Sequence, residues 1–334
     1  ALAVASALLA LLAVEVALRV IARGMPPGSL GAAIAKAGPL GEGEAPKWVH
    51  ALRVDPHPRI VYGLRPGFDG PVLMGGGAVP LCTNSLGFRG PEWTRAKPPG
   101  TVRIVGLGDS VMMGYGVPIE ESYLALLERQ LAAARPGVRF ECLDLGVAGY
   151  NTVQEVEVLR QVGLGLDPDL VLLGVVPNDA NGIIYPRDPP SRLALDRSFL
   201  LRALSGQGGE HTWEDFAGHG PFRAAARELA ALAERHGFEL VAFTHRTTPT
   251  SGALLAELAR SGVPTRDLGV ELAAHCAAHG IDDYFNSALV VSSIDAHPSA
   301  AGHALIARDL AAFLVEAGLV DRAIAGAGAA PLRD

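Results

Sequence analysis

The sequence is poor in cysteine and in charge for its length. Its 334 residues include three cysteines, which are too few and too scattered for a disulfide scaffold or a zinc knuckle. Charged residues make up 19%, the formal net charge is -7 and no basic run occurs. Nucleic acid is therefore not expected as a partner, because phosphate binding requires clustered Lys and Arg. Hydrophobic residues make up 49%, which excludes intrinsic disorder for the whole chain.

A long hydrophobic run lies at the start of the sequence. Residues 1–22 are apolar apart from Ser6, Glu15 and Arg19, and a helix of this length spans roughly 30 Å, the thickness of a bilayer core. Glu15 and Arg19 would share one helix face and partly neutralise each other. No cleavage site of the A-x-A type follows. The run therefore predicts a retained transmembrane anchor over residues 1–23, with the lipid bilayer as a partner.

Two features of the sequence favour opposite sides of the membrane for the domain that follows this run. Arg19, Arg23 and Lys36 by themselves favour the cytoplasm for the downstream part. Large domains are translocated largely regardless of nearby charge. We expect a membrane-anchored protein whose main domain lies outside the cytoplasm, on the periplasmic side.

Composition divides the rest of the chain into three parts. Residues 24–100 are rich in Gly and Pro, which predicts a stalk and an irregular lead-in with short strands or a hairpin. Residues 101–320 form the main domain, and residues 321–334 are expected to be a C-terminal tail. Strands are predicted in VRIVGLG, RFECLDLGV, DLVLLGVV and FELVAFTH, and helices over residues 120–135, 152–166, 222–236, 251–262, 265–279 and 300–317. This alternation predicts an α/β fold, a three-layer α/β/α sandwich with a central parallel sheet.

Polar residues follow the ends of the predicted strands, where such sheets bind ligands. The first strand ends in GDS at Ser110, the second in GVAGYNT at residues 146–152 and the third in an Asn-Asp pair at Asn178. Asp295 and His297 directly precede the last helix. A serine on a glycine-containing turn can act as a nucleophile beside backbone N–H groups, with a histidine as its base and a carboxylate that fixes the histidine tautomer.

These blocks resemble the SGNH/GDSL hydrolase superfamily over roughly residues 62–315. They are GDSV, GVAGYNT, VVPNDAN and DAHPSAAGH, in that order. The resemblance implies the flavodoxin-like SGNH hydrolase fold and a serine esterase or acyl-transferring activity that needs no cofactor. The stretches TNSLGFRGPE, GDSVMMGYGVP and LGVAGYNTVQE are similar to a membrane-anchored subgroup of that family with an N-terminal helix.

The resemblance also implies a role for each site residue. Ser110 would be the nucleophile, His297 the base and Asp295 the acid, and the oxyanion hole would comprise the Ser110 N–H, the Gly149 N–H and the Asn178 amide. Asp295 stands two residues before His297, whereas the family usually has three. The group that orients His297 is therefore open between Asp295, a backbone carbonyl and the nearby Asp282 and Asp283.

The expected substrate is a small acyl ester or an acylated carbohydrate, by hydrolysis or by acyl transfer. The alternative is an accessory or structural subunit of a membrane complex in which activity is incidental. The long lead-in, the membrane helix and the short Asp-x-His spacing favour that alternative. His275 and His279 would share a helix face, but no third ligand is apparent, so no metal site is predicted.

Overall fold

The structure is a computed structural model that describes residues 30, 33, 37, 46–184 and 217–328. The predicted anchor over residues 1–23 lies outside the described residues. Within the described part, none of the helices has the length and apolar character needed to cross a membrane.

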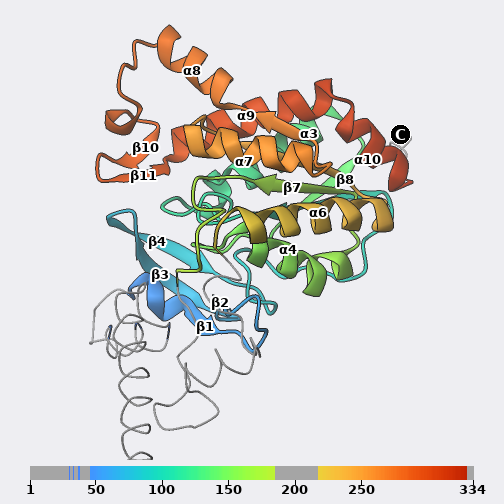
Figure 1. Ribbon diagram of the computed structural model, residues 1–334, viewed down its shortest axis with the longest axis horizontal. Coiled ribbons are helices and arrows are strands. Elements are labelled where there is room, and N and C mark those ends of the chain that lie inside the picture. Colours follow the sequence, from blue (N-terminus) through green and yellow to red (C-terminus); the bar gives the residue numbers. More distant parts are fainter. Residues whose placement is uncertain (1–29, 31–32, 34–36, 38–45, 185–216, 329–334) are drawn as a thin grey trace, which may run out of the picture.

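A five-stranded parallel sheet forms the centre of the molecule (Figure 1). Its strands are β5 (Thr101–Leu107), β6 (Arg139–Asp144), β7 (Leu170–Gly174), β8 (Glu239–Thr244) and β9 (Thr265–Asp267). They lie side by side in the order β6-β5-β7-β8-β9, which is the flavodoxin-like order. Strand order reverses between β5 and β7, so the loops after these two strands flank the crevice in which such sheets bind ligands.

Helices cover both faces of the sheet, so the predicted parallel sheet flanked by helices is confirmed. One layer comprises α4 (Thr152–Gln161), α6 (His219–His236) and α7 (Pro249–Arg260), and the other α3 (Tyr123–Ala134), α9 (Ala300–Glu316) and α10 (Leu319–Gly326). Every residue of β5 is buried, because neither face of that strand meets solvent. The leucines of α3 at helical spacing, Leu124, Leu127 and Leu131, are buried against the sheet layer.

The chain departs from the predicted elements in two places. Residues 265–279 were expected to form one helix, but they begin with the edge strand β9 and continue into α8 (Gly269–Ala278). Three residues are too few to show a strand period in the sequence. The expected tail also begins inside α10, whose Leu319, Val320 and Ala323 are buried.

The Gly- and Pro-rich lead-in forms two small antiparallel sheets that pack on the main domain. In one, β1 (Leu52–Val54) pairs with β2 (Tyr62–Leu64), and in the other β3 (Asp69–Met74) pairs with β4 (Gly77–Cys82). Arg89 is 1% exposed and donates hydrogen bonds to the carbonyl oxygens of Met113, Gly114, Val117 and Pro80. The lead-in is therefore fixed to the loop that follows β5.

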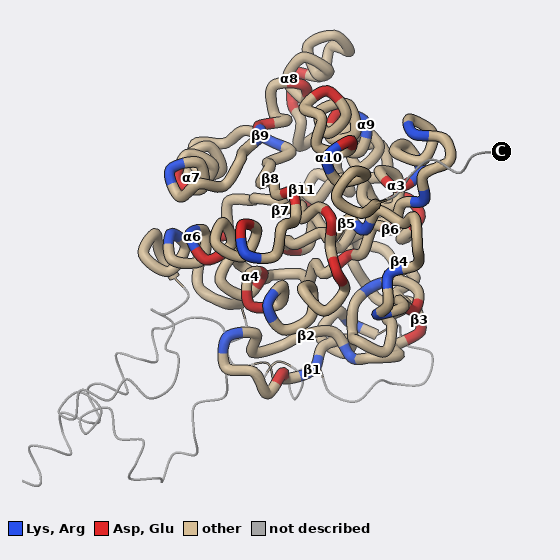
Figure 2. Tube along the Cα trace, turned by 90° about the vertical axis from the view of Figure 1, so that its right-hand side faces the viewer, with Lys and Arg blue, Asp and Glu red and all other residues tan. Residues whose placement is uncertain are grey.

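A third antiparallel pair lies at the edge of the molecule. Strands β10 (Val290–Ser292) and β11 (Asp295–Pro298) form a hairpin that leads into α9. The β3–β4 turn packs against this hairpin at Gly75, which has no side chain. A Cβ atom added at Gly75 would lie 2.6 Å from Val291 Cγ1 and 3.5 Å from Asp295 Oδ2. Lys and Arg are interspersed with Asp and Glu over the described chain (Figure 2).

Candidate active site

Hydrogen bonds connect Ser110, His297 and Asp295 in one chain. The Nε2 atom of His297 lies 2.8 Å from Ser110 Oγ, and its Nδ1 atom lies 2.5 Å from Asp295 Oδ1. The fold brings the serine and the histidine together across 187 positions of sequence. With Nδ1–H donating to the carboxylate, Nε2 is free to accept the serine proton. This is the arrangement that activates a serine nucleophile.

The short Asp-x-His spacing works because both residues belong to a strand. Side chains two residues apart in a strand point to the same face, and β11 places Asp295 beside His297 in this way. Asp295 Oδ1 also accepts the His297 backbone N–H at 3.1 Å. Asp283 instead accepts hydrogen bonds within its own turn, from the Phe285 N–H and the Asn286 side chain. Among the candidates that the sequence left open, Asp295 is the one in contact with the imidazole.

Three hydrogen-bond donors lie around the cavity that Ser110 and His297 share. Ser110, Gly149 and Asn178 all line this cavity, whose volume is about 560 Å³. Among the described residues, the backbone N–H groups of Ser110 and Gly149 donate to no protein acceptor. The Asn178 amide makes a long contact of 3.4 Å to the Tyr150 carbonyl oxygen. Donors in these positions can stabilise negative charge on a substrate oxygen.

The backbone at position 149 requires glycine. Gly149 has a φ of +81°, in the left-handed region that other residues rarely adopt. A Cβ there would lie 2.3 Å from Ile184 Cδ1 and 2.9 Å from the Tyr62 hydroxyl. A larger residue would therefore strain the backbone that carries this N–H and displace the Ile184 side chain.

Buried carboxyl groups lie beneath the nucleophile. Asp109 Oδ2 is 3.2 Å from Ser110 Oγ, and burial raises the pKa of Asp109. Asp179 accepts hydrogen bonds from the Val176 N–H and the Thr152 hydroxyl, and burial raises its pKa to about 8. Asp179 thus joins the end of β7 to the start of α4, and so holds the loop of Asn178 against the loop of Gly149.

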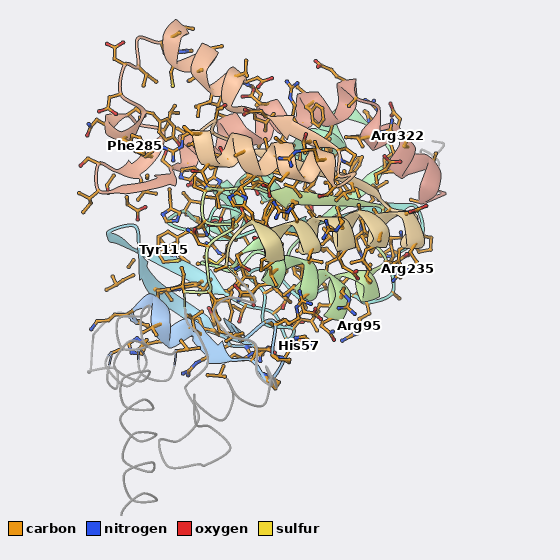
Figure 3. All side chains as sticks on the ribbon, in the orientation of Figure 1. His57, Arg95, Tyr115, Arg235, Phe285 and Arg322 are labelled. Carbon is orange, nitrogen blue, oxygen red and sulfur yellow. The ribbon has the colours of Figure 1, made fainter. Side chains whose placement is uncertain are left out.

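The sequence did not indicate two aromatic residues of this site. The Tyr115 ring lies 4.5 Å from the His297 ring, and Trp48 of the lead-in packs edge-on against Tyr115 at 6.1 Å. Both line the cavity. Figure 3 shows Tyr115 above the β3–β4 hairpin. Their roles depend on contacts between distant segments, so no local pattern in the sequence drew attention to either.

The same cavity has two further side chains that sequence reasoning missed. Ile294, at the tip of the β10–β11 hairpin, is 96% exposed. Arg246, two residues after β8, also lines the cavity. Ile294 stands three residues before His297, where the family usually has its acid, and Arg246 could have been noted only because it follows a predicted strand.

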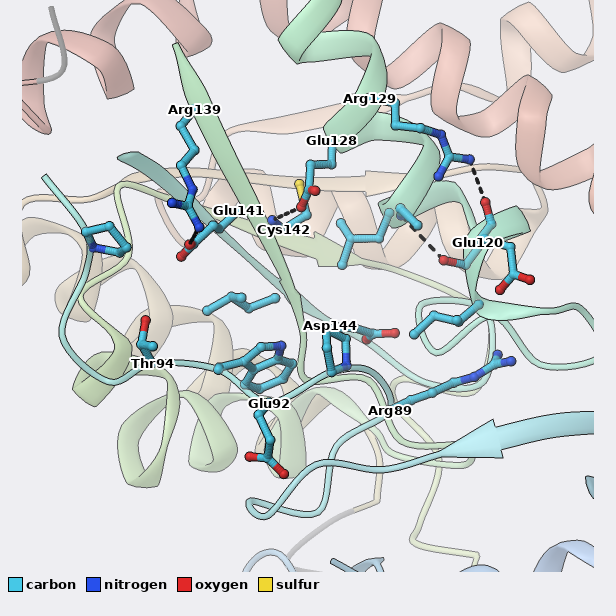
Figure 4. Close-up of a pocket in the computed structure, with 18 residues that line it drawn as sticks. Arg89, Glu92, Thr94, Glu120, Glu128, Arg129, Arg139, Glu141, Cys142 and Asp144 are labelled. Atoms are coloured by element: carbon cyan, nitrogen blue, oxygen red, sulfur yellow. Dashed lines mark hydrogen bonds and ion pairs between the residues drawn. The ribbon is translucent and has the colours of Figure 1, made fainter. Parts of the chain in front are cut away.

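A second cavity of about 680 Å³ lies along the edge strand β6 and shares no lining residue with the first (Figure 4). Asp144 and Glu128 line it, and burial raises the pKa of both carboxyl groups, that of Asp144 to about 7. Glu128 accepts the Cys142 N–H at 2.7 Å, which satisfies a donor on the open edge of β6. Among the described residues, no group of three side chains is suited to hold a metal ion.

Comparisons with known proteins place the chain in a family. The model of the GDSL-like lipase/acylhydrolase family matches residues 107–305, and the chain belongs to this family. It is accordingly an ester-hydrolysing enzyme. No curated protein matches the sequence.

The solved structures that the chain is similar to show low sequence identity. An acetyl xylan esterase, AlAXEase, is 14% identical with a TM-score of 0.43, over 64% of this chain and 100% of that one. A lipase/acylhydrolase from Enterococcus faecalis is 18% identical with a TM-score of 0.41, over 65% and 96%. A two-domain esterase active on acetylated mannans is 14% identical with a TM-score of 0.43, over 65% of this chain and 49% of that one.

Proposed function

We propose that this enzyme is a serine esterase in which Ser110, His297 and Asp295 form the catalytic triad. The observation that carries the proposal is the continuous hydrogen-bonded chain from Ser110 Oγ through the imidazole to Asp295. An accessory subunit without activity has no need of a histidine that bridges a serine and a carboxylate. The assembled chain therefore favours the hydrolase over that alternative.

The proposed reaction proceeds through an acyl-enzyme. Ser110 Oγ attacks the ester carbonyl carbon while its proton passes to His297 Nε2, and Asp295 stabilises the resulting imidazolium. The tetrahedral intermediate expels the alcohol, which takes that proton from His297. Water then attacks the acyl-enzyme, again giving a proton to His297, and the carboxylic acid leaves as Ser110 recovers its proton. A sugar hydroxyl in place of water would give acyl transfer.

The oxyanion of each intermediate would receive hydrogen bonds from the Ser110 N–H, the Gly149 N–H and the Asn178 amide. Their place in the lining of one cavity and the unused backbone donors support this assignment. One such donor is typically worth about 3 kcal/mol of transition-state stabilisation.

We propose a short acyl group on a larger alcohol, such as an acylated carbohydrate, as the substrate class. The cavity lining includes Trp48, Tyr115 and Arg246, so its walls offer aromatic and charged contacts beyond the reacting carbonyl. Residues 1–22, outside the described structure, are proposed to anchor the enzyme in the membrane with the domain outside the cytoplasm. Their apolar composition supports this proposal.

Active-site labelling tests the triad. The wild type should react with a fluorophosphonate probe and hydrolyse 4-nitrophenyl acetate. Ser110→Ala should abolish labelling, and both Ser110→Ala and His297→Ala should lower kcat by at least about 10³-fold. Ser261→Ala, at the end of α7, is the matched control and should retain both properties. Labelling that persists in Ser110→Ala would exclude Ser110 as the nucleophile.

A further inference from the structure

Arg246 is a cation on the wall of the active-site cavity, and no carboxylate of the described residues pairs with it. It lies two residues after β8 and lines the same cavity as Ser110 and His297. Among the described residues, no carboxylate lies within 4.0 Å of its guanidinium group, although the whole chain has 35 Asp and Glu. The nearby Asp283 is engaged in its own turn, and Asp295 is bonded to His297.

Backbone hydrogen bonds and two aromatic rings hold Arg246 in position. Its carbonyl oxygen accepts hydrogen bonds from the Thr244 hydroxyl at 3.1 Å and the Ser251 hydroxyl at 3.0 Å. Its guanidinium carbon lies 5.3 Å from the Tyr284 ring centroid and 4.7 Å from that of Phe285. These rings hold the cation by cation–π attraction without using its hydrogen-bond donors. Figure 3 shows Phe285 beside β10, at the same edge of the molecule as Tyr115.

The strand order of the sheet determines how far Arg246 lies from the reacting groups. Ser110, Asn178 and Arg246 follow the neighbouring strands β5, β7 and β8. Adjacent strands are about 4.8 Å apart, so the backbones at β5 and β8 are separated by roughly 10 Å. Gly149 follows β6, on the other side of Ser110. A group bound by Arg246 would thus extend past Asn178, a few bonds from the ester carbonyl.

We propose that Arg246 determines specificity by binding an anionic group, a carboxylate, phosphate or sulfate, on the ester substrate. The planar guanidinium forms paired, charge-assisted hydrogen bonds to such groups, and its preorganised position lowers the entropy cost of forming them. The inference rests on the proposed esterase function and narrows its substrate to anionic esters. The anion can belong to the alcohol, as in an acylated acidic sugar, or to the acyl group.

Two substrate pairs test the proposal and distinguish these sources. For the alcohol side, 4-acetoxybenzoate is compared with its neutral methyl ester, and for the acyl side, 4-nitrophenyl glutarate monoester with 4-nitrophenyl valerate. In at least one pair, Arg246→Gln should lower kcat/KM for the anionic ester about 10-fold or more, chiefly through KM, and change the neutral ester less than about threefold. Arg246→Lys should retain part of the preference, because it keeps the charge but loses the paired geometry.

Arg266 provides the matched control. It also lies over an aromatic ring, 5.1 Å from the Phe313 centroid, but does not line the cavity. Arg266→Gln removes the same charge and should leave both preferences unchanged. The proposal is overturned if Arg246→Gln affects anionic and neutral esters alike in both pairs, or if Arg266→Gln produces the same loss.

Binding of unreactive analogues separates this inference from the proposed function. The amides 4-acetamidobenzoate and N-(4-nitrophenyl)glutaramate, each with its neutral primary carboxamide, can be titrated calorimetrically into wild type and Arg246→Gln. Each anionic compound should bind the wild type more tightly than its neutral carboxamide does, and Arg246→Gln should remove that difference. If the wild type hydrolyses none of the esters, the esterase proposal fails, while this titration still decides whether Arg246 binds anions. Equal binding of the acid and its carboxamide by wild type for both compounds overturns the anion site.

Discussion

At the scale of single residues, the orientation of one imidazole depends on a carboxylate two positions away. Asp295 holds His297 through Nδ1 and through the backbone N–H. Both contacts come from one extended segment, so they persist only while β11 stays paired with β10. A substitution that keeps the shape of Asp295 but removes its charge therefore tests the acid without disturbing the hairpin.

Asp295→Asn should slow acyl-enzyme formation by roughly 10²- to 10⁴-fold, because the amide no longer stabilises the imidazolium and permits the wrong tautomer. Stopped-flow release of 4-nitrophenol measures this step. Asp283→Asn should be nearly silent, since its carboxylate contacts only its own turn. Full activity in Asp295→Asn together with inactive Asp283→Asn would transfer the role of acid to Asp283.

Asn178 provides a second test at this scale. If its amide donates to the oxyanion, Asn178→Ala should lower kcat by about 10²-fold or more with little change in KM. A residue that served only the turn would lower the melting temperature instead and leave kcat per folded molecule intact. Measuring kcat and Tm on the same preparation separates these results.

At the scale of elements, the site comprises the ends of parallel strands and two hairpins that reach over them. The loops after β5, β6 and β7 carry Ser110, Gly149 and Asn178, and the β10–β11 hairpin brings His297 from the far end of the chain. The β3–β4 turn packs on that hairpin through Gly75. Two elements from opposite ends of the sequence thus determine where the imidazole lies.

The stability of the fold should depend on pH through Asp144, the last residue of β6. Asp144 ends β6, accepts the Gly146 N–H at 2.8 Å and has a pKa raised to about 7 by burial. Since an unfolded aspartate has a pKa near 3.9, the folded state holds the proton more tightly. As the pH rises from roughly 4 to 7, this group should therefore lower the free energy of unfolding by about 1.4 kcal/mol per pH unit.

Asp144→Asn removes that pH dependence, because the amide keeps an acceptor oxygen but cannot ionise. The free energy of unfolding of the variant minus that of wild type should be more favourable to the variant at pH 8 than at pH 5. Urea unfolding at both pH values measures this difference. Asp321→Asn is the control, since Arg135 lowers the pKa of Asp321 below both values and its effect should be the same at each. If Asp144→Asn and wild type differ in free energy of unfolding by the same amount at pH 5 and pH 8, Asp144 does not titrate between these pH values.

At the scale of the whole molecule, the lead-in and the α/β domain form a single body. Arg103 is fully buried and donates to the carbonyl oxygens of Thr94 and Arg95 as well as to Glu141. Together with Arg89, it fixes residues 80–95 to the sheet and to the loop after β5. Trp48 of the same lead-in lines the active-site cavity, so the segment predicted to be a stalk and lead-in contributes to the active-site wall.

The proposed anchor gives a prediction at this scale. The intact chain should stay in the membrane fraction after a high-salt wash, because residues 1–22 are apolar enough to span a bilayer. A chain lacking residues 1–24 should be recovered as a folded, soluble domain that still reacts with the fluorophosphonate probe. Full-length protein in the soluble fraction without detergent would contradict the anchor.

Local patterns in the sequence were enough to predict the parallel sheet, its flanking helices and the hydrolase family. Buried strands and amphipathic helices have periods that are visible over short windows, and the motif blocks are contiguous. For the same reason, Ser110, Gly149, Asn178, Asp295 and His297 could be named as candidates before any distance was known. Their catalytic roles stay predictions.

Only the tertiary structure decided which groups meet. The strand geometry of β11 puts Asp295, rather than Asp282 or Asp283, against the imidazole, and a three-residue strand such as β9 is too short to show a period. Trp48, Tyr115 and Arg246 reach the cavity from three separate segments. Such contacts arise from packing between residues far apart in the chain, and no periodicity or motif in a single sequence encodes them.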